Sequence, residues 1–313
     1  MKKDIKKLFE EYINECQFSK RLRPETLRGY KAVFKTFSKI MPEVISTKEL
    51  TKEMMDAFFK RIETRERPVG KKIIKTGVKN STIYTYWSKL NCFCLWLFIN
   101  GHIIGNPLEN IKPPEPVYDD NRALEKADIE KIITAINLHS KNSLILKRDM
   151  LMINLLLFCG LRKGEFISLQ VRDVDMENHL LTVRGETSKS KKTRRIPLNP
   201  VVMMHMREYI GERNKLGYKI PNLIVSSTED RGLSVHGLKH CVERLEDLSG
   251  VDFHLHRFRH SFASNLARQN TEAVAIQKLM GHQSLKMTMV YLRSLKAEDF
   301  RDDVNRLTID NLL

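Results

Sequence analysis

The sequence of 313 residues has no apolar run long enough to cross a membrane. Its longest apolar run, residues 151–160, is about half of the roughly 20 residues that a spanning helix needs. The charged N-terminal stretch has no apolar core of the signal-peptide kind. No segment repeats at a solenoid period, and no low-complexity tract is present. These absences exclude membrane-spanning and repeat proteins and predict a cytoplasmic protein with no membrane partner.

Cysteine is scarce, with five residues in an odd number that has no disulfide-framework spacing. Cys92 and Cys94 resemble half of a zinc site, but no matching pair follows at zinc-finger distance. We therefore expect reduced thiols in a reducing compartment, and no metal at these positions.

Acidic residues are also in deficit, because 38 Asp and Glu stand against 54 Lys and Arg, a formal net charge of +16. A basic excess of this size predicts a polyanionic partner, and nucleic acid ahead of a membrane surface. A surplus that only keeps the protein soluble is the weaker alternative. The charge carries no information about sequence specificity.

Hydrophobic residues make up 42% of the chain, enough to build packed cores. In the first hundred residues, apolar positions three and four apart predict amphipathic helices. These cover residues 3–18, 24–41, 51–64 and about 81–100. Between the last two lies a stretch rich in Lys and Arg, residues 65–79, which is interpreted as a basic loop. The sequence therefore predicts an N-terminal four-helix unit.

The segment I-K-P-P-E-P-V-Y-D-D-N carries three prolines and predicts an extended, stiff connector. We place a domain at residues 1–111, a linker at 112–121 and a second domain at 122–313, whose tail begins near 294. Helices are expected in the second domain at 125–138, 145–158, 200–215, 234–248, 257–268, 272–280 and 284–293. Residues 180–185 and 193–198 predict two strands joined by a basic turn, and 222–226 is a candidate third strand. The predicted class is mainly α, with one small antiparallel sheet.

The segment H-L-H-R-F-R-H, residues 254–260, gathers three histidines and two arginines. In a helix that starts near His256, the side chains of His256, Arg259 and His260 share one face. The histidine pair has the spacing of metal ligands, but the neighbouring arginines would repel a cation. A site that binds phosphate explains the pattern better than a metal site does.

Two further motifs place polar residues at the ends of apolar helices. In G-L-R-K-G-E, Gly160 ends a helix, Arg162 lies in the turn and Glu165 follows one helical turn later. In L-M-G-H, a glycine precedes His282 in the same way, and Tyr291 lies nine residues further on. Side chains at such junctions are held more firmly than those in loops, as an active site requires.

These motifs, with the lysines of the strand turn between them, resemble in residue and order the tyrosine recombinases, the phage-integrase and Xer-like family. The resemblance covers nearly the whole chain, because the N-terminal unit that ends in N-G-H-I-I-G-N-P-L is similar to the family's core-binding, SAM-like domain. It implies a site-specific DNA recombinase that cuts and rejoins strands through a 3′-phosphotyrosyl intermediate and a Holliday junction.

The chemistry agrees with the residue types, since a side-chain nucleophile stores the phosphodiester energy as an ester and guanidiniums hold the charged phosphate. The resemblance assigns Tyr291 as the nucleophile, His256 as its base and His282 as a phosphate donor. The full catalytic set is Arg162, Lys189, His256, Arg259, His282 and Tyr291, supported by Glu165 and His260. Lys189 is chosen by its distance from R-R-I-P-L, and Lys191 and Lys192 are rivals. No cofactor is implied.

Basic residues outside this set are candidates for DNA contacts. They are Lys71, Lys72, Lys75, Lys79, Lys191, Lys192, Arg194 and Arg257. The resemblance implies double-stranded DNA with a specific site as the partner, a homotetramer built from two dimers on DNA, and a monomer when free. The tail, with Phe300, Val304 and Leu307 on one face, would dock on a neighbouring subunit or on its own chain. A type IB topoisomerase and a catalytically silent DNA-binding protein are the alternative functions.

Overall fold

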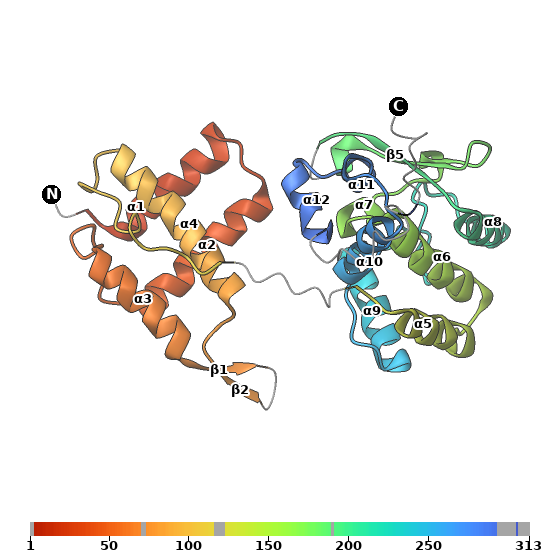
Figure 1. Ribbon diagram of the computed structural model, residues 1–313, viewed down its shortest axis with the longest axis horizontal. Coiled ribbons are helices and arrows are strands. Elements are labelled where there is room, and N and C mark those ends of the chain that lie inside the picture. The colour runs from red at the N-terminus through yellow and green to blue at the C-terminus, as the bar shows by residue number, and fades with distance from the viewer. Residues whose placement is uncertain (1–2, 70–72, 116–122, 189–190, 293–304, 306–313) are drawn as a thin grey trace. The chain divides into compact units, whose positions relative to one another are not determined.

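The computed structural model describes residues 3–69, 73–115, 123–188, 191–292 and 305 (Figure 1). The chain divides into two compact units, Met1–Tyr118 and Asp119–Leu313, and each is described by itself. Residues 116–121 of the predicted linker and nearly all of the predicted tail lie outside the described residues. Within the described part, no helix combines the length and the apolar character needed to cross a bilayer.

The first unit is helical, as predicted. Its helices are α1 (Ile5–Asn14), which continues through a wider turn over Glu15–Ser19, α2 (Pro24–Ile40), α3 (Lys52–Thr64) and α4 (Asn80–Ile99). Polar caps define two of the starts, because the side chains of Asp4 and Thr51 accept backbone N–H groups at the first turns of α1 and α3. The core is aromatic, with Phe9 stacked on Phe34 and Phe93 packed edge-on against Phe9.

The segment 65–79, predicted as a loop, is instead a hairpin. Strands β1 (Glu66–Val69) and β2 (Ile73–Thr76) pair antiparallel, with Glu66 opposite Thr76. Gly77 leaves the hairpin at a φ of 68°, where a Cβ atom would collide with the Glu63 carbonyl. The loop prediction was wrong because basic side chains hid a β-branched strand, I-I-K-T, that pairs locally.

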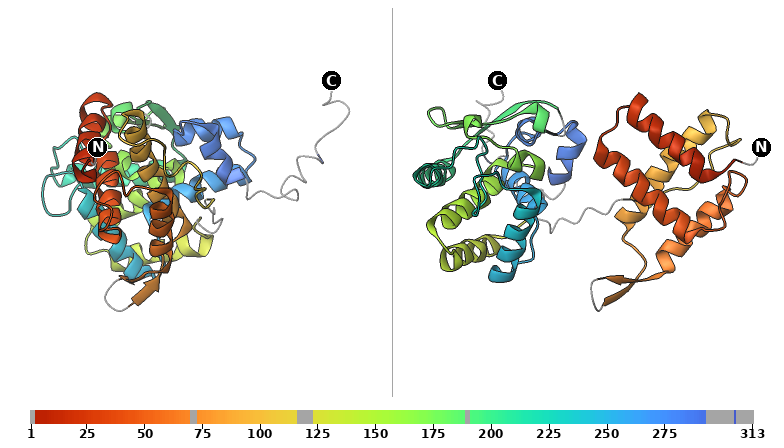
Figure 2. Two further views of the ribbon diagram at one scale, coloured as in Figure 1. Left: turned by 90° about the vertical axis from the view of Figure 1, so that its left-hand side faces the viewer. Right: turned by 180° about the vertical axis from the view of Figure 1, so that it is seen from behind.

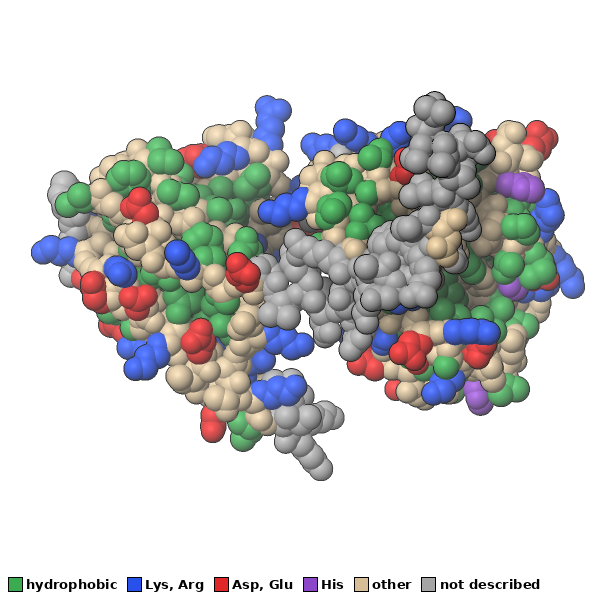
Figure 3. All heavy atoms as spheres, viewed as in Figure 1, with side chains coloured by type: hydrophobic (Ala, Val, Ile, Leu, Met, Phe, Trp, Pro, Cys, Tyr) green, Lys and Arg blue, Asp and Glu red, His purple; other side chains and the backbone are tan. Residues whose placement is uncertain are grey.

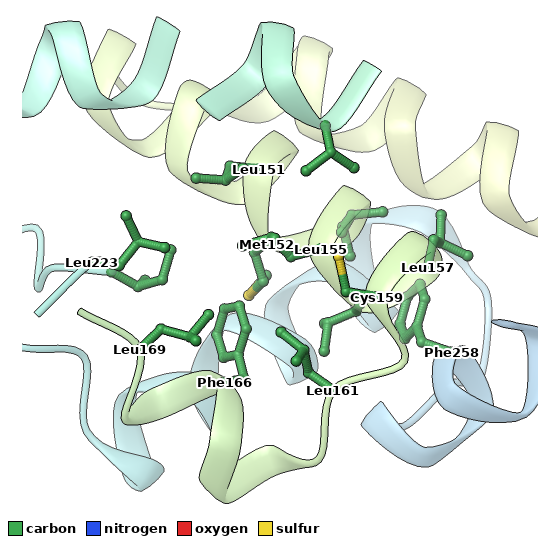
Figure 4. Close-up of a cluster of buried hydrophobic side chains, with 14 of the residues drawn as sticks. Leu151, Met152, Leu155, Leu157, Cys159, Leu161, Phe166, Leu169, Leu223 and Phe258 are labelled. Carbon is green, nitrogen blue, oxygen red and sulfur yellow. The ribbon is translucent and has the colours of Figure 1, made fainter. Parts of the chain in front are cut away.

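The second unit is built around a helix that is buried on nearly all sides. Its helices are α5 (Lys126–His139), α6 (Ser143–Cys159), α7 (Lys163–Ile167), α8 (Pro200–Lys215), α9 (Val235–Ser249), α10 (Leu255–Arg268), α11 (Ala273–Met280) and α12 (Leu285–Leu292). Helix α6 packs against α8 and α10, and Figure 4 shows its apolar side chains, among them Leu151, Met152 and Leu155, meeting Phe166 and Phe258. An apolar helix without a polar face is expected at such a centre.

A three-stranded antiparallel sheet lies beside these helices in the order β3 (Val174–Asp175), β4 (Leu180–Val183) and β5 (Arg194–Pro197). The two predicted strands are confirmed as β4 and β5, whereas the candidate third strand at 222–226 is wrong. That segment makes only isolated bridges, since the amide of Val225 is bonded to the Tyr209 hydroxyl rather than to a neighbouring strand. Its apolar residues mark burial and not pairing.

The predicted mainly helical class with a small sheet is thus confirmed. In Figures 1 and 2 the blue helices α11 and α12 lie together next to α10, and β5 contacts α11. Two left-handed glycines end the helices that border this region: Gly160 after α6 (φ 54°) and Gly281 after α11 (φ 62°). The polar junctions that follow these glycines form the candidate site.

Candidate active site

Three arginines from different elements converge on the C-terminal end of α11. Each donates to one of three successive main-chain carbonyls: Arg194 Nε to Leu279 (2.8 Å), Arg259 Nη2 to Met280 (2.6 Å) and Arg162 Nη2 to Gly281 (3.1 Å). The last carbonyls of a helix lack intrahelical donors and carry partial negative charge, so cations are stabilised there. The end of α11, and with it the following residue His282, is therefore held by three guanidiniums.

The carboxylate of Glu165 connects these arginines. Its Oε1 accepts from Arg162 Nη1 (2.9 Å), Arg194 Nη1 (3.0 Å) and the Ser188 hydroxyl (2.9 Å), and its Oε2 accepts from Arg194 Nη2 (2.8 Å) and the Arg162 amide (2.9 Å). Burial by itself would raise the pKa of Glu165, but Arg194 and then Arg162 outweigh it and lower the pKa to about 2. The group is a permanent anion at neutral pH, placed where Glu165 was expected to support Arg162.

Arg259 is the most enclosed of the candidate catalytic residues. Its side chain is 5% exposed, and it also donates from Nη1 to the carbonyl of Gly160, across the end of α6. Burial, followed by the positive charge of Arg162, lowers the pKa of Arg259 to about 9. The guanidinium therefore remains charged at neutral pH, close to the second guanidinium, that of Arg162.

His282 follows Gly281 and turns toward α12. Its Nδ1 lies 2.9 Å from the hydroxyl of Thr288, which is fully buried, and its ring stacks against that of Tyr291. Burial and then the positive charges of Arg259 and Arg162 lower the pKa of His282 to about 4. The imidazole is neutral at neutral pH, so it offers a ring N–H and no further positive charge. The sequence did not point to Thr288 as a site residue. The one hint of its role is that it is a polar residue between two methionines of α12.

Tyr291 lies near the end of α12, between two histidine rings. Its ring centroid is 5.1 Å from that of His260 and 6.0 Å from that of His282. The side chain is half-buried against a small apolar cluster that includes Phe262 and Met280. A negative charge on the phenol would interact favourably with the charge of Arg259. The phenol thus lies beside the rings of His260 and His282, while its action with His256 stays a prediction.

His256 lies in the first turn of α10, the helix that also carries Arg259 and His260. Its side chain is exposed at the surface, whereas Arg259 one turn later is buried and His260 is half-buried. Although part of the side chain is exposed, partial burial of the ring, followed by the positive charges of His254 and Arg259, lowers the pKa of His256. A neutral imidazole at neutral pH is the form that accepts a proton.

The strand-turn lysines are only partly described. Lys189 lies outside the described residues, so its position relative to the arginines is not part of the site's geometry. Its rivals Lys191 and Lys192 are exposed, and Lys191 adopts a left-handed φ of 57° with its amide bonded to the Ser188 carbonyl. The choice of lysine stays a prediction.

Arg194 and Arg257, which were expected to contact DNA, both make hydrogen bonds within the protein. Arg194 is buried and its guanidinium is bonded to Glu165 and to the carbonyl of Leu279, and its contact with DNA stays a prediction. The sequence signal for the burial of Arg194 was overlooked. Residues along β5 alternate between buried and exposed, and Arg194 is on the same buried face as Ile196. Arg257 is half-buried and binds the carbonyls of Asp252 and Ala123 within its own chain.

The remaining basic candidates are in the first unit. Lys75 lies on β2 and Lys79 at the start of α4, and both are exposed, while Lys71 and Lys72 lie outside the described residues. Figure 3 shows Lys and Arg side chains beside the grey tip of this hairpin. Across the described ranges there is no group of three or more His, Cys, Asp or Glu arranged to hold a metal ion.

Comparison with family models matches both units. The description "Phage integrase family" fits residues 122–298, and "Phage integrase SAM-like domain" fits residues 4–112. A tyrosine recombinase of Thermosipho africanus is 29% identical over 309 residues, covering 96% of this chain and 99% of its own. Tyrosine recombinase XerC of Alcanivorax borkumensis is 30% identical over 230 residues, covering 72% of this chain and 73% of its own.

Solved structures share the fold. The Tn1549 transposon integrase in complex with transposon right end DNA superposes with a TM-score of 0.74 at 18% identity, covering 97% of this chain and 99% of its own. XerH site-specific recombinase bound to palindromic difH substrate gives a TM-score of 0.71 at 19% identity, covering 95% of this chain and 83% of its own. At these identities the likeness establishes the architecture alone.

Proposed function

The chain belongs to the phage integrase family, which is the family of the tyrosine recombinases, and from this premise we propose which of its residues carry out recombination. The protein is a site-specific DNA recombinase, an enzyme that breaks and rejoins DNA strands. The observation that carries the assignment of its active site is the convergence of Arg162, Arg259, His282 and Tyr291 around the end of α11.

In the proposed reaction the Tyr291 phenol oxygen attacks the scissile phosphorus and its proton passes to His256. The bond from phosphorus to the 5′ oxygen breaks, leaving a 3′-phosphotyrosyl ester, and a lysine of the strand turn, Lys189 in our assignment, protonates the departing oxygen. A 5′-hydroxyl of the partner strand then attacks the ester, releases the tyrosine and joins the strands. Two such exchanges pass through a Holliday junction. Each step conserves the phosphoryl group without an external energy source.

The two guanidiniums supply the electrostatic part of catalysis. The transition state spreads negative charge over the phosphoryl oxygens, and Arg162 and Arg259 are fixed beforehand by carbonyls and by Glu165. Because they need not reorganise when the phosphate arrives, loss of either should cost roughly 3–4 kcal/mol of barrier. His282, held by Thr288 and neutral, adds a hydrogen-bond donor to the same phosphate, and Glu165 and His260 support the arrangement.

We infer that residues 1–111 form the core-binding domain and 122–313 the catalytic domain, joined by the linker at 112–121. The net charge of +16 and the exposed Lys75 and Lys79 support contacts with DNA phosphates. A recombinase exchanges strands between two duplexes, which supports a homotetramer of two dimers on DNA and a free monomer. Docking of the tail on a neighbouring subunit is part of this proposal. Five free thiols support action in the cytoplasm.

The test is covalent capture on a nicked duplex that carries the recognition site, because the nick lets the cleaved fragment diffuse away. Wild type should form a protein–DNA adduct on a denaturing gel, and Tyr291→Phe should form none while it binds the same DNA. Tyr84→Phe, an exposed tyrosine of α4, is the matched control and should form the adduct normally. An adduct with Tyr291→Phe would refute the nucleophile.

The competing functions give different outcomes in the same assay. A silent DNA-binding protein would bind the duplex and form no adduct even as wild type. A type IB topoisomerase would relax a supercoiled plasmid that lacks any particular site. The named relatives are recombinases and integrases, so neither alternative is favoured.

A further inference from the structure

Arg194 is a buried arginine next to the proposed catalytic pair, Arg162 and Arg259. It opens β5, where alternate residues point inward, so that Arg194 is buried and Arg195 beside it is exposed. We propose that Arg194 is a positioning residue for strand cleavage: it fixes Glu165 against the end of α11 and, together with Ser188, ties the turn that precedes the leaving-group lysine to the same carboxylate. This inference rests on the proposed site.

The contacts of Arg194 are directed entirely into the protein. Nη1 and Nη2 form a forked pair with the two oxygens of Glu165, at 3.0 Å and 2.8 Å, and Nε donates to the carbonyl of Leu279 at 2.8 Å. A Cβ atom on Gly281 would lie 2.9 Å from Nη1, so the turn before His282 packs directly on the guanidinium. Arg194 therefore determines where the end of α11 lies relative to Glu165.

Glu165 passes this constraint to Arg162. The carboxylate accepts from Arg162 through both the side chain and the amide, so the start of α7 and the guanidinium are held together. The three arginines and one carboxylate carry a charge of +3 − 1, that is +2. Without Arg194 the charge falls to +1, and Glu165 would be left with Arg162 as its single cationic partner. The charge of Arg162 would then be largely neutralised by Glu165, and Arg162 would hold the phosphate less strongly.

Ser188 extends the constraint to the strand turn. Its hydroxyl donates to Oε1 of Glu165 at 2.9 Å, the oxygen that also receives Arg162 and Arg194, and the serine is 1% exposed. Its carbonyl accepts the amide of Lys191 at 3.2 Å. Ser188 immediately precedes Lys189 in sequence. The residue before the proposed proton donor is thus anchored on the group that holds the arginines.

The first experiment compares Arg194→Gln with Arg195→Gln in single-turnover cleavage of the nicked duplex. Both variants lose one positive charge from β5, but only the first loses the buried contacts. We expect Arg194→Gln to cleave about 100-fold more slowly, the effect of a displacement near 1 Å in a catalytic group, and Arg195→Gln to stay within about threefold. The salt dependence of DNA binding should be the same for Arg194→Gln and wild type, because a buried residue releases no counterion.

A substrate with sulfur in place of the 5′ oxygen tests whether Ser188 acts through the lysine that protonates the leaving group. A thiol has a pKa of about 8.5 and leaves as a thiolate without being protonated. Ser188→Ala should slow cleavage of the oxygen substrate about tenfold, as expected for loss of one hydrogen bond of about 1.4 kcal/mol, and should regain the wild-type rate on the sulfur substrate. Lys189→Ala should show the same recovery. Arg194→Gln should recover only in part, since its arginine defect remains.

A double variant controls for the possibility that Arg194→Gln fails to fold. Arg194→Gln leaves Glu165 short of a partner in the interior, whereas Glu165→Gln with Arg194→Gln removes both charges and can keep the side-chain hydrogen bond. This double variant should melt above Arg194→Gln, although Arg162 loses its carboxylate, and should still cleave at least 100-fold more slowly than wild type, in keeping with the lost positioning.

Three results would overturn the inference: wild-type cleavage by the double variant, wild-type cleavage by folded Arg194→Gln, or a Ser188→Ala defect that is equal on both substrates. Absence of an adduct with the wild-type protein would instead refute the proposed site, so the two failures are distinguishable.

Discussion

The rings of His282 and Tyr291 lie almost parallel, with an interplanar angle of 8° and 6.0 Å between their centroids. His282 lies in the turn between α11 and α12 and Tyr291 lies on α12, and the contact between His282 Nδ1 and the Thr288 hydroxyl ties the turn to this helix. Thr288 is one helical turn before Tyr291 on α12. The position of the proposed nucleophile relative to the phosphate donor therefore depends on a buried hydroxyl that does not itself react.

Thr288→Val should slow cleavage about tenfold, because the variant keeps the shape of the side chain but loses a hydrogen bond of about 1.4 kcal/mol. Single-turnover adduct formation at saturating protein measures this rate. Thr288→Ser retains the hydroxyl and serves as the control, with an expected rate near wild type. Equal rates for all three proteins would show that His282 is oriented by other contacts.

The lowered pKa of His282 predicts that stability falls in mild acid. The pKa is about 4 in the folded chain, against an ordinary value of 6.5, so the unfolded chain binds more protons between these values. The free energy of unfolding should therefore decrease as the pH falls from about 6.5 to about 4, by at most about 3 kcal/mol from this group. Urea unfolding at pH 7 and pH 5 measures the difference.

A variant checks which group titrates. His282→Asn should show a smaller loss of stability between the two pH values than wild type does. An unchanged pH dependence in His282→Asn would mean that this imidazole is not the group that titrates.

Glu165→Ala should destabilise the catalytic unit by about 3–5 kcal/mol, because it leaves the buried guanidinium of Arg194 and the half-buried one of Arg162 without their carboxylate. In wild type the same ion pairs should weaken as the pH falls from about 4.5 toward 2, since the folded pKa is the lower of the two. Urea unfolding monitored by circular dichroism tests the substitution. Glu177→Ala, at an exposed position, should change stability by less than about 0.5 kcal/mol.

Gly160→Ala and Gly250→Ala separate backbone strain from packing. Both glycines end helices at left-handed φ, but a Cβ on Gly160 would collide with the Phe262 ring, whereas nothing lies within 4 Å of one on Gly250. We expect Gly250→Ala to destabilise the protein by about 1–2 kcal/mol through backbone strain. Gly160→Ala should cost the same strain and about 1–3 kcal/mol more from the collision. Only Gly160→Ala should also slow cleavage, because the Gly160 carbonyl accepts from Arg259.

The exposed lysines on the hairpin and at the start of α4 should contribute to the salt dependence of DNA binding. Removing two phosphate contacts with Lys75→Gln and Lys79→Gln should make the slope of log K against log salt shallower by about 2. Lys52→Gln with Lys60→Gln, exposed on α3 of the same unit, is the matched loss of charge and should leave the slope nearly unchanged. Binding titrations from low to moderate salt measure both slopes, and equal changes in both would reveal a general charge effect.

Local patterns predicted most elements because they depend on neighbours in sequence. The helices of both units follow apolar spacing, and Gly160 and Gly281 end helices where they were expected to. The hairpin at 66–76 and the buried run at 222–226 were misjudged, since whether a β-branched stretch pairs or is merely buried depends on which backbone groups are brought next to it.

By itself the sequence determined which chemical groups are available and in what order: the arginines, histidines and tyrosine of the site, and the glycines that let helices end beside them. Only the tertiary structure decided that three guanidiniums meet three successive carbonyls at the end of α11, and that Arg194 is buried against Glu165. These contacts join residues that are 21 to 119 positions apart. Hydrogen bonds between such distant groups have no periodic signature in the chain, and they arise only when the core has packed.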